Sequence, residues 1–287
     1  MKKINVVYNP AFNPISSKLN QTQLLKNASE ELDIELKFFT SFDINTTKAK
    51  ANLPFISNKI LFMDKNIALA RWLESNGFEV INSSIGINNA DNKGLSHAII
   101  AQYPFIKQIK TLLGPQNFDR EWNPVMLDVF INQIKQSMEF PVIVKSVFGS
   151  FGDYVFLCLD EQKLRKTLMS FNQQAIVQKY ITCSKGESVR VIVVNNKVIG
   201  ALHTTNNSDF RSNLNKGAKA ERFFLNKEQE NLAVKISKVM QLFYCGIDFL
   251  FDQDRSLIFC EVNPNVQLTR SSMYLNTNLA IELLKAI

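Results

Sequence analysis

The amino-acid sequence predicts an α/β protein, and its first 90 residues carry the strongest signal. Short apolar runs alternate there with segments whose apolar residues recur at helical spacing. Such alternation is typical of a parallel sheet with helices on both faces. Beyond residue 103, apolar runs occur in pairs around polar turns, the pattern of antiparallel hairpins. We therefore expect a first α/β domain at residues 1–90, followed by hairpins and helices.

Each element of the first domain follows from its local pattern. Strands are expected at residues 3–9, 34–39, 59–64 and 78–83. Helices are expected between them, at residues 17–32 and 65–77, and the second should end at Gly77. Residues 86–90 are interpreted as a loop that leads into a helix beginning near Asp91.

The remaining chain is expected to alternate hairpins with helices. A Trp-Asn-Pro break interrupts a mixed helical segment at 117–139. Hairpins are expected at residues 139–160, 188–205 (turning at Asn195-Asn196) and 246–265. A strand at 175–181 and helices at 161–171, 226–243 (with Asn226 as N-cap) and 276–287 complete the pattern.

Composition narrows the class of protein. Apolar residues make up 46% of the chain and charged residues 21%, a balance typical of folded domains. No apolar run approaches the roughly 18 residues needed to span a bilayer, and the N-terminal apolar stretch is too short for a signal peptide. The four cysteines form no C-x-x-C pair. We therefore expect reduced thiols, no zinc site and no membrane partner, in a cytoplasmic protein.

The formal net charge of +7 has two interpretations. Because the lysines are spread along the chain, a solvated basic surface explains it. The alternative is attraction of an anionic partner such as a nucleotide or a polyacidic substrate. A nucleic acid is not the expected partner, since basic residues do not interleave with aromatic residues as in single-strand binders.

A lysine followed by a glycine turn is the first candidate site. In "VIVKSVFGSFGDYV", Lys145 ends an apolar run, and Gly149 and Gly152 follow it. Glycines let a backbone bend close to a ligand, so this turn and its lysine could clamp nucleotide phosphates. The segment does not match the P-loop pattern G-x-x-x-x-G-K-[ST]. An ordinary hairpin with a solvated lysine is the alternative.

The segment "GIDFLFDQDRSLIFCEVNPN" (246–265) carries acids inside two apolar runs. A hairpin symmetric about residues 254–255 would pair position 248 with 261, 250 with 259 and 252 with 257. Asp248, Glu261 and Asn263 would then share one face. Opposed carboxylates repel unless a cation lies between them, and such oxygen ligands suit Mg²⁺ or Mn²⁺. Solvated acids in another register are the alternative.

A third candidate is the polar segment "NNSDFRSNLNKGAKA" (206–220), which has no strand or helix period. Arg211, flanked by Ser and Asn, is suited to recognising phosphate or carboxylate. A surface loop is the alternative.

In this order, the three segments resemble the ATP-grasp superfamily and, within it, the RimK-like amino-acid ligases. The resemblance covers roughly residues 80–287 and is strongest over 139–269. Its most specific motifs are "DFRSNLNKGAKA" (209–220) and "GIDFL…FCEVNPN". The segment "VQKYITCSKGESVRVIVV" (177–194) is similar to the family's V-Q-E-Y-I…K-G-x-D-I-R.

The resemblance implies an ATP-grasp fold with α/β and α+β parts. A pre-ATP-grasp α/β domain would span residues 1–90, a central lid subdomain 91–180, and a C-terminal subdomain with a metal site 181–287. ATP would lie between the last two parts. The implied enzyme is an ADP-forming carboxylate–amine ligase that works through an acyl phosphate. It would join an amino acid such as glutamate to a small-molecule or peptide carboxylate, using ATP and two Mg²⁺ or Mn²⁺ ions.

The resemblance also implies roles for individual residues. Lys145 would contact the α- and β-phosphates of ATP, and Lys93 would be a second nucleotide lysine. Arg211 and Asn213 would act near the γ-phosphate and the acyl phosphate. The adenine would pass a segment made of Gln178, Lys179, Tyr180 and Ile181, with the backbone of Lys179 and Ile181 reading its edge. The two metal ions would be held by Asp248, Glu261 and Asn263, with Glu261 bridging both.

The chain departs from the family at several positions. The family usually has a carboxylate at the position of Lys179 and an Asp for the ribose at the position of Ser188. Glu187 could replace that Asp only with a shifted strand register. A small-residue S-P-G loop often follows the metal motif, where this chain has "PNVQLTR". These departures motivate a second hypothesis, a nucleotide-binding regulator without turnover. Charge alone motivates a third, a nucleic-acid binder, and the sequence leaves a homo-oligomer open.

Overall fold

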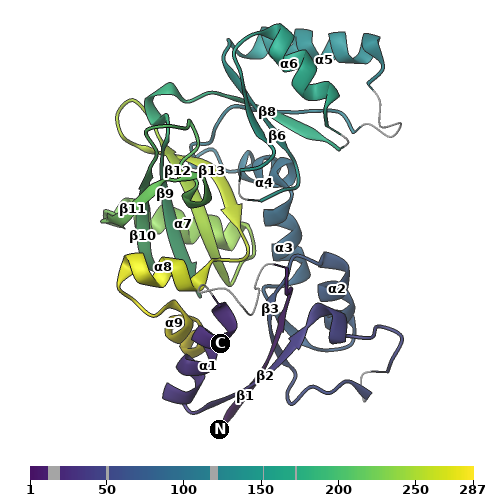
Figure 1. Ribbon diagram of the computed structural model, residues 1–287, viewed down its shortest axis with the longest axis vertical. Coiled ribbons are helices and arrows are strands. Elements are labelled where there is room, and N and C mark those ends of the chain that lie inside the picture. Colours follow the sequence, from purple (N-terminus) through teal and green to yellow (C-terminus); the bar gives the residue numbers. More distant parts are fainter. Residues whose placement is uncertain (12–19, 50–51, 117–121, 151, 172) are drawn as a thin grey trace.

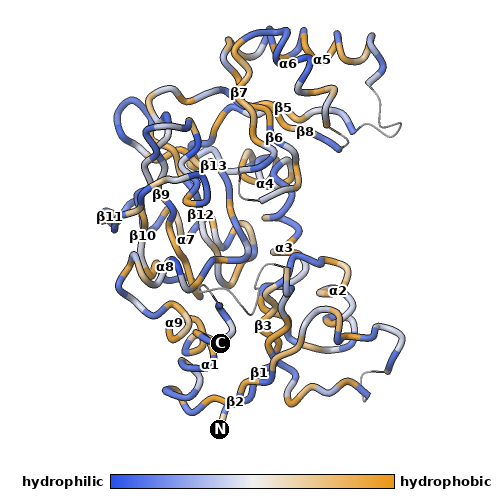
Figure 2. The backbone as a smooth tube through the Cα atoms, in the orientation of Figure 1, coloured by the Kyte–Doolittle hydropathy of each residue, from blue (hydrophilic) through white to orange (hydrophobic). Residues whose placement is uncertain are grey.

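The computed structural model describes residues 1–11, 20–49, 52–116, 122–150, 152–171 and 173–287. Its described strands form three sheets that follow one another along the long axis of the molecule (Figure 1). A parallel sheet lies at one end, a five-stranded antiparallel sheet in the middle, and a four-stranded antiparallel sheet at the other end. Hydrophobic residues concentrate in the strands, whereas the connecting loops are largely hydrophilic (Figure 2).

The N-terminal sheet is parallel, as predicted, with the strand order β2-β1-β3-β4. Alternate residues of β1 supply two cores: Ile4 and Val6 pack with helix α1, and Val7 packs with helix α2. The first three residues of the helix predicted at 17–32 lie outside the described residues. The elements are β1 (Lys2–Tyr8), α1 (Gln21–Glu31), β2 (Ile34–Thr40), β3 (Lys59–Met63), α2 (Ile67–Ser75) and β4 (Glu79–Ile81).

The prediction of a loop at residues 86–90 is wrong, because helix α3 (Ser84–Asp91) occupies this segment. Ser83 caps the helix by accepting a hydrogen bond from the amide of Gly86. A Cβ atom at Gly86 would lie 2.4 Å from the carbonyl oxygen of Gln241, so glycine here permits close packing rather than a turn. Helix α4 (Lys93–Ile100) follows directly.

The sheet at the far end, called the lid here, has the order β5-β8-β6-β7. The predicted hairpin at 139–160 is confirmed as the antiparallel pair β6–β7. Helices α5 and α6 share a core with this sheet, in which Ile134 and Leu164 are fully buried. Residues 117–121 of the predicted mixed segment lie outside the described part. The elements are β5 (Thr111–Leu113), α5 (Pro124–Ser137), β6 (Val142–Ser146), β7 (Val155–Cys158), α6 (Glu161–Met169) and β8 (Ala175–Lys179).

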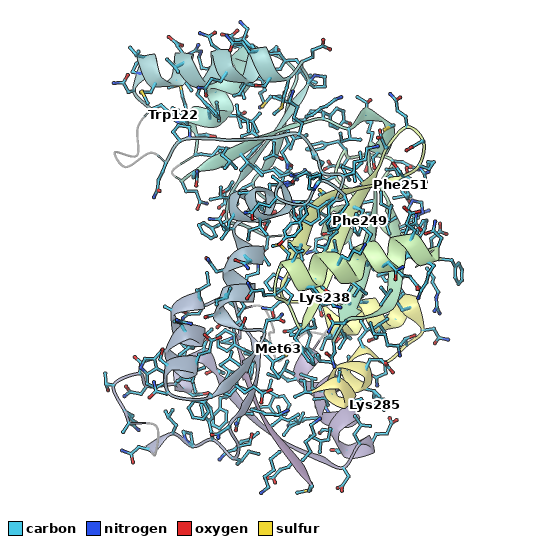
Figure 3. The ribbon with its side chains drawn as sticks, turned by 180° about the vertical axis from the view of Figure 1, so that it is seen from behind. Met63, Trp122, Lys238, Phe249, Phe251 and Lys285 are labelled. Atoms are coloured by element: carbon cyan, nitrogen blue, oxygen red, sulfur yellow. The ribbon has the colours of Figure 1, made fainter. Side chains whose placement is uncertain are left out.

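The middle sheet has the order β11-β10-β9-β12-β13, and helix α7 covers one of its faces. Phe249 and Phe251 of β12 are buried in the core that this sheet shares with α7, and Figure 3 shows their positions from behind. The predicted turn at Asn195-Asn196 and the predicted N-cap Asn226 are both present. The elements are β9 (Glu187–Val194), β10 (Lys197–Thr205), β11 (Lys219–Phe223), α7 (Lys227–Val239), β12 (Tyr244–Phe251) and β13 (Leu257–Asn263).

Two C-terminal helices return the chain to the N-terminal sheet (Figure 1). Helix α8 (Leu268–Leu275) was not predicted, and α9 (Leu279–Ala286) corresponds to the predicted closing helix. Leu283 and Leu284 of α9 are buried in the same core as Ile4 and Leu25. Among the described helices, none combines the length and the hydropathy that a bilayer crossing requires.

Candidate active site

A cavity of about 450 Å³ opens where the lid, the middle sheet and the ends of β1 and β3 meet. Its size lies in the range of small-molecule sites, about 300–1,000 Å³. Every residue that the sequence singled out for the nucleotide, the reaction or the metal lines this cavity. The lining residues predicted from the sequence are Lys93, Lys145, Gln178, Lys179, Tyr180, Ile181, Glu187, Ser188, Arg211, Asn213, Asp248, Glu261 and Asn263.

The β12–β13 hairpin pairs Asp248 with Glu261, as predicted. The other two predicted pairs are wrong: Leu250 pairs with Ile258, and residue 257 pairs with Phe251. The cause is a β-bulge next to Asp248, where Cys260 is the additional residue. Because of the bulge, Cys260 and Glu261 both face the cavity, whereas the flanking residues 259 and 262 both face the core.

Sequence reasoning missed Arg190, which β9 places beside Asp248. Its Nε and Nη2 atoms donate to the two carboxylate oxygens of Asp248 at 2.7 and 2.6 Å. Asp248 raises the pKa of Arg190 further above its usual value. Burial, with the nearby charge of Glu261, raises the pKa of Asp248 against the opposing effect of Arg190. The available signal was a lone arginine among valines in an apolar strand, which needs a counter-charge.

Lysines surround the second carboxylate. Burial would raise the pKa of Glu261, but Lys93, Lys145 and Arg190 lower it to about 2. Lys145 is buried, and its Nζ lies 3.6 Å from the Sγ of Cys260. Burial would lower the pKa of Lys145, yet its acidic neighbours raise it. Burial lowers the pKa of Lys93 despite the charge of Glu261. The carboxylate of Glu261 is therefore ionised and surrounded by cations.

The residues around Asp248 and Glu261 fit a divalent cation bound together with phosphate. The Nδ2 of Asn263 donates to Asp248 Oδ2 at 3.1 Å and to Glu261 Oε1 at 3.4 Å, so the amide bonds to both acids. In the described part of the chain, no three His, Cys, Asp or Glu side chains gather as a metal site. Two carboxylates and an amide nevertheless suffice for Mg²⁺, which usually takes its remaining ligands from water and phosphate.

Arg211 connects the polar loop to the glycine turn of the lid. Its Nη1 donates to the carbonyl oxygen of Gly152 at 2.9 Å, and its Nη2 pairs with Asp209 at 2.7 Å. Gly152 has a φ of +73°, and a Cβ there would lie 2.7 Å from the Oδ1 of Asn213. On the other side of the turn, the Nζ of Lys93 donates to the carbonyl oxygen of Gly149 at 2.7 Å. The predicted loop and turn are therefore in direct contact; Phe151 within the turn lies outside the described residues.

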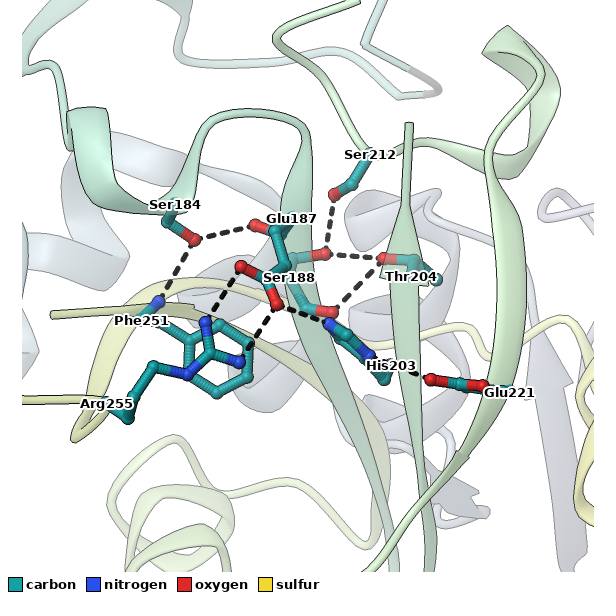
Figure 4. Close-up of polar contacts among 9 residues, drawn as sticks. All are labelled: Ser184, Glu187, Ser188, His203, Thr204, Ser212, Glu221, Phe251 and Arg255. Atoms are coloured by element: carbon teal, nitrogen blue, oxygen red, sulfur yellow. Dashed lines mark hydrogen bonds and ion pairs between the residues drawn. The ribbon is translucent and has the colours of Figure 1, made fainter. Parts of the chain in front are cut away.

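Residues 187 and 188, where the chain differs from the family pattern, are both held by local hydrogen bonds (Figure 4). The two carboxylate oxygens of Glu187 each accept a hydrogen bond of 2.9 Å from Arg255, and His203 lies 2.7 Å from one of them. Arg255 lowers the pKa of Glu187. Ser188 instead bonds to the hydroxyls of Thr204 and Ser212, at 2.8 and 2.6 Å. The cavity wall at this point is therefore made of hydroxyl groups, and Glu187 is occupied by partners.

Gln178 is fully buried and lines the cavity. Its Nε2 lies 2.8 Å from the Nε2 of His97 and donates to Thr111 at 2.9 Å. The His97 ring is also held by Gln108, whose Oε1 lies 2.8 Å from Nδ1, and by the carbonyl oxygen of Cys260, which lies 3.1 Å from Nε2. Among the described residues, none bonds to the Oε1 of Gln178, which leaves an acceptor for a ligand.

The comparison with protein families matches residues 90–287 to the RimK-like ATP-grasp domain. The chain belongs to the RimK-like ATP-grasp family. The ATP-grasp fold and the family predicted from the sequence are confirmed. Its relatives include glutamate and other amino-acid ligases.

Individual relatives differ in how much they share with this RimK-like chain. The uncharacterized protein MG012 homolog of Mycoplasma pneumoniae is 69% identical over 287 residues, all of both chains. Human β-citrylglutamate synthase B is 30% identical over 207 residues, which are 71% of this chain and 51% of that protein. The chain thus spans about half the length of that human relative.

Solved structures show the same fold at low sequence identity. A D-alanine–D-alanine ligase from Bacillus anthracis, solved in complex with ATP, has a TM-score of 0.68 at 17% identity. The match covers 100% of this chain and 96% of that one. The N-terminal sheet, which the family model does not include, is therefore part of a fold seen in other ATP-grasp enzymes.

Proposed function

We propose that this chain is an ADP-forming carboxylate–amine ligase that adds an amino acid such as glutamate to an acidic acceptor. The observation that carries the proposal is the meeting of Lys93, Lys145, Arg211 and the pair Asp248–Glu261 around one cavity. Phosphoryl transfer needs positioned cations rather than a protein nucleophile, and this set supplies them. Ligase relatives support the same reaction class.

In the proposed reaction, Lys145 and Lys93 hold the phosphates of ATP against the glycine turn. The substrate carboxylate attacks the γ-phosphorus, the bond to ADP breaks, and an acyl phosphate forms. Arg211 and Asn213 stabilise the negative charge that moves with the phosphoryl group. The amine then attacks the acyl carbon, and phosphate and a proton leave as the amide forms. Mg²⁺ or Mn²⁺, as two ions held by Asp248, Glu261 and Asn263, would neutralise phosphate charge when bound.

The three parts of the chain have distinct tasks in this proposal. Within the predicted central part, residues 91–180, the lid sheet and its helices cover ATP, and residues 181–287 carry the metal ligands. Residues 1–90 supply the wall of the acceptor side, to which Tyr8 and Met63 contribute. The adenine is expected beside Gln178–Ile181 and the ribose beside Ser188, with Glu187 held away by Arg255. Cytoplasmic localisation and the oligomeric state belong to the same proposal as expectations.

The decisive experiment separates the nucleotide products after incubating the protein with ATP, Mg²⁺, glutamate and a panel of acids. ADP, phosphate and an amide product are expected. AMP and pyrophosphate would contradict the proposal. Glu261→Ala should abolish ADP formation, whereas Glu228→Ala, which changes an exposed acid on α7, should leave it unchanged.

One observation favours a second function, a nucleotide-binding regulator without turnover. Both oxygens of Asp248 are bonded to Arg190, which leaves this carboxylate less free to bind a metal ion. Calorimetry distinguishes the two functions. Tight binding of ATP and Mg²⁺ without ADP formation for any acid and amine pair would favour the regulator. ADP formation that Glu261→Ala abolishes would exclude it.

A further inference from the structure

The β12–β13 ladder ends directly beside the proposed metal ligands. Gly246 pairs with Asn263, and this is the last pair at that end of the ladder. Pro264 follows, and a proline has no amide N–H to donate to a neighbouring strand. The segment "PNVQLTR" begins at this proline, in the place of the family's small-residue loop. The backbone next to Asn263 therefore needs support from outside the sheet.

The side chain of Asn82, which follows β4, supplies this support. Asn82 is buried, and its Nδ2 donates to the carbonyl oxygens of Tyr244 and Pro264, both at 2.8 Å. Its Oδ1 accepts from the backbone amides of Phe243 and Tyr244, at 2.7 and 3.1 Å. Two donated and two accepted hydrogen bonds use the full capacity of the side-chain amide. Asn82 thus joins β12 to the end of β13 where their own ladder stops.

Tyr244 supports the next residue of the same segment. If the ladder continued in its register, Tyr244 would lie opposite Asn265, on the face that carries Asn263. The two side chains meet there, since the Oη of Tyr244 donates to the Oδ1 of Asn265 at 2.9 Å. Tyr244 is buried, and a buried tyrosine hydroxyl usually has such a partner. The chain after Asn263 is therefore fixed at two successive residues, Pro264 and Asn265.

Asn263 depends on this support more than the two acids do. Asp248 and Glu261 lie within the paired part of the hairpin. Asn263 is the last paired residue of β13, and its Nδ2 donates to the two acids at 3.1 and 3.4 Å. A shift of the backbone at Pro264 would therefore displace the amide of Asn263 and leave the acids in place.

We infer that Asn82 and Tyr244 are positioning residues for the metal-binding amide of Asn263. The cavity lining in the described part of the chain includes neither of them, so they act through the backbone at Pro264 and the side chain of Asn265. This inference rests on the proposed function, because Mg²⁺ or Mn²⁺ at Asn263 belongs to that reaction. It gives the N-terminal sheet a task in metal binding, through the residue that follows β4.

The test separates metal binding from nucleotide binding. Calorimetry titrates Mn²⁺ into nucleotide-free protein and, separately, ADP into metal-free protein. Asn82→Ala should weaken Mn²⁺ binding about tenfold or more, the usual effect of removing a contact that orients a metal ligand. Tyr244→Phe, which removes only the hydroxyl, should weaken it in the same direction. The affinity for ADP should stay unchanged in both variants, because Lys93 and Lys145 belong to α4 and β6.

Asn5→Ala is the matched control. Asn5 is a fully buried asparagine of β1 and does not line the cavity. Its Nδ2 donates to the carbonyl oxygens of Ser57 and Lys59 at 2.8 and 3.0 Å, and its Oδ1 accepts from the amide of Ile56 at 3.0 Å. Asn5→Ala should lower the urea midpoint much as Asn82→Ala does, but it should leave the affinity for Mn²⁺ unchanged.

Several outcomes would contradict the inference. If Asn82→Ala leaves Mn²⁺ binding unchanged, or if Asn5→Ala weakens it equally, Asn82 only joins the N-terminal sheet to the middle sheet. If Asn82→Ala does not fold, unchanged Mn²⁺ binding in Tyr244→Phe decides against the inference. A wild type that binds no Mn²⁺ also overturns it, even where ADP forms. Asn82-dependent Mn²⁺ binding without ADP formation from any acid and amine would support the inference and contradict the ligase.

Discussion

At the scale of single residues, Arg190 explains how Asp248 and Glu261 can face each other in a buried position. Two opposed carboxylates repel, and burial increases the cost of each charge. Arg190 binds Asp248 through two short hydrogen bonds. Three surrounding cations lower the pKa of Glu261 to about 2, although burial alone would raise it. The neighbouring cations therefore help to stabilise the opposed carboxylates of Asp248 and Glu261, so a metal ion is not their only source of positive charge.

Arg190→Gln should destabilise the fold strongly, because it leaves the buried Asp248 carboxylate without its partner. Breaking a buried ion pair on one side costs about 3–5 kcal/mol in the free energy of unfolding. The double variant Arg190→Gln/Asp248→Asn should lose less than the sum of the single variants. Urea unfolding measures all three. The control Arg71→Gln removes an exposed arginine whose half-buried partner Glu74 keeps its bonds to Ser84, so it should cost below about 1 kcal/mol. Equal losses at both sites would contradict this account.

His97 makes the stability depend on pH. Burial lowers its pKa from 6.5 to about 4, against the opposing effect of its hydrogen bond to Gln108. The unfolded chain therefore binds more protons between these two pH values, and stability is lost as the pH falls from 6.5 towards 4. Between pH 7.5 and pH 5 the loss should be about 2 kcal/mol from this residue. Denaturant unfolding at both pH values should show a smaller loss for His97→Gln; an unchanged loss would contradict the assignment.

At the scale of elements, Gly186 holds the loop that carries Arg211. Its amide donates to the carbonyl oxygen of Phe210 at 2.9 Å, and its own carbonyl accepts from Asn206 at 2.7 Å. Its φ is +69°, and a Cβ there would lie 2.2 Å from the carbonyl oxygen of Asn206. Gly217, within the loop that carries Arg211, has a φ of +87°, but no atom lies within 4 Å of a Cβ built there.

The two glycines provide a matched experiment. Gly217→Ala should cost only the left-handed backbone strain, about 1 kcal/mol, whereas Gly186→Ala adds a backbone clash and should cost about 3 kcal/mol. Gly186→Ala should also weaken the binding of a non-hydrolysable ATP analogue, because the loop must move. Urea unfolding and calorimetry measure the two effects. Similar values for both variants would show that close contact at Gly186 is unimportant.

The β12–β13 hairpin shows how much of the site was predictable. The symmetric register predicted from the polar turn is one residue off near the turn, and it places Asp248 opposite Glu261 only because the bulge offsets that error. The bulge at Cys260 was not predictable, because its contacts come from distant segments: the Nζ of Lys145 lies 3.6 Å from its Sγ, and the Nε2 of His97 lies 3.1 Å from its carbonyl oxygen. Arg190 was missed for a related reason: its partner lies 58 residues away, and nothing local indicates that β9 lies beside β12.

Helices and strands were predicted correctly where the local sequence pattern was strong. The parallel first sheet and the hairpins are confirmed because period and turn residues agree there. Helix α3 was missed because Gly86 lowers helix propensity by about 1 kcal/mol relative to alanine. Only the tertiary contact with Gln241 explains that glycine. Strand β5 has three residues, too few for a recognisable period.

At the scale of the whole molecule, the two ends of the chain share one core, and the lid has its own. Ile4 and Leu61 of the N-terminal sheet are buried together with Leu283 of α9. The Nζ of Lys2 donates to the carbonyl oxygen of Leu284 at 3.1 Å. The lid core is drawn from residues 112–177. Stability should therefore be shared between the first and last residues of the chain, and separate in the lid.

The two tryptophans allow this to be tested, because one lies in each unit. Trp72 packs against the core of the N-terminal sheet, and Trp122 of the lid stacks on Phe130 and donates to Leu168 (Figure 3). Truncating a buried leucine or isoleucine to alanine costs about 2–5 kcal/mol. In a Trp122→Phe background the fluorescence in urea reports only Trp72 and the N-terminal sheet. In a Trp72→Phe background it reports only Trp122 and the lid.

Leu283→Ala, in the last helix, should lower the urea midpoint reported by Trp72, although the residues are far apart in the sequence. Ile134→Ala, in the lid core, should lower the midpoint reported by Trp122 and leave that of Trp72 in place. The physical reason is that the cores of Leu283 and Trp72 lie on the two faces of the N-terminal sheet, whereas Ile134 belongs to the separate core of the lid. If both probes shift equally with both substitutions, the lid unfolds together with the rest. A lid that opens on its own is what a ligand bound between it and the middle sheet requires for entry and release.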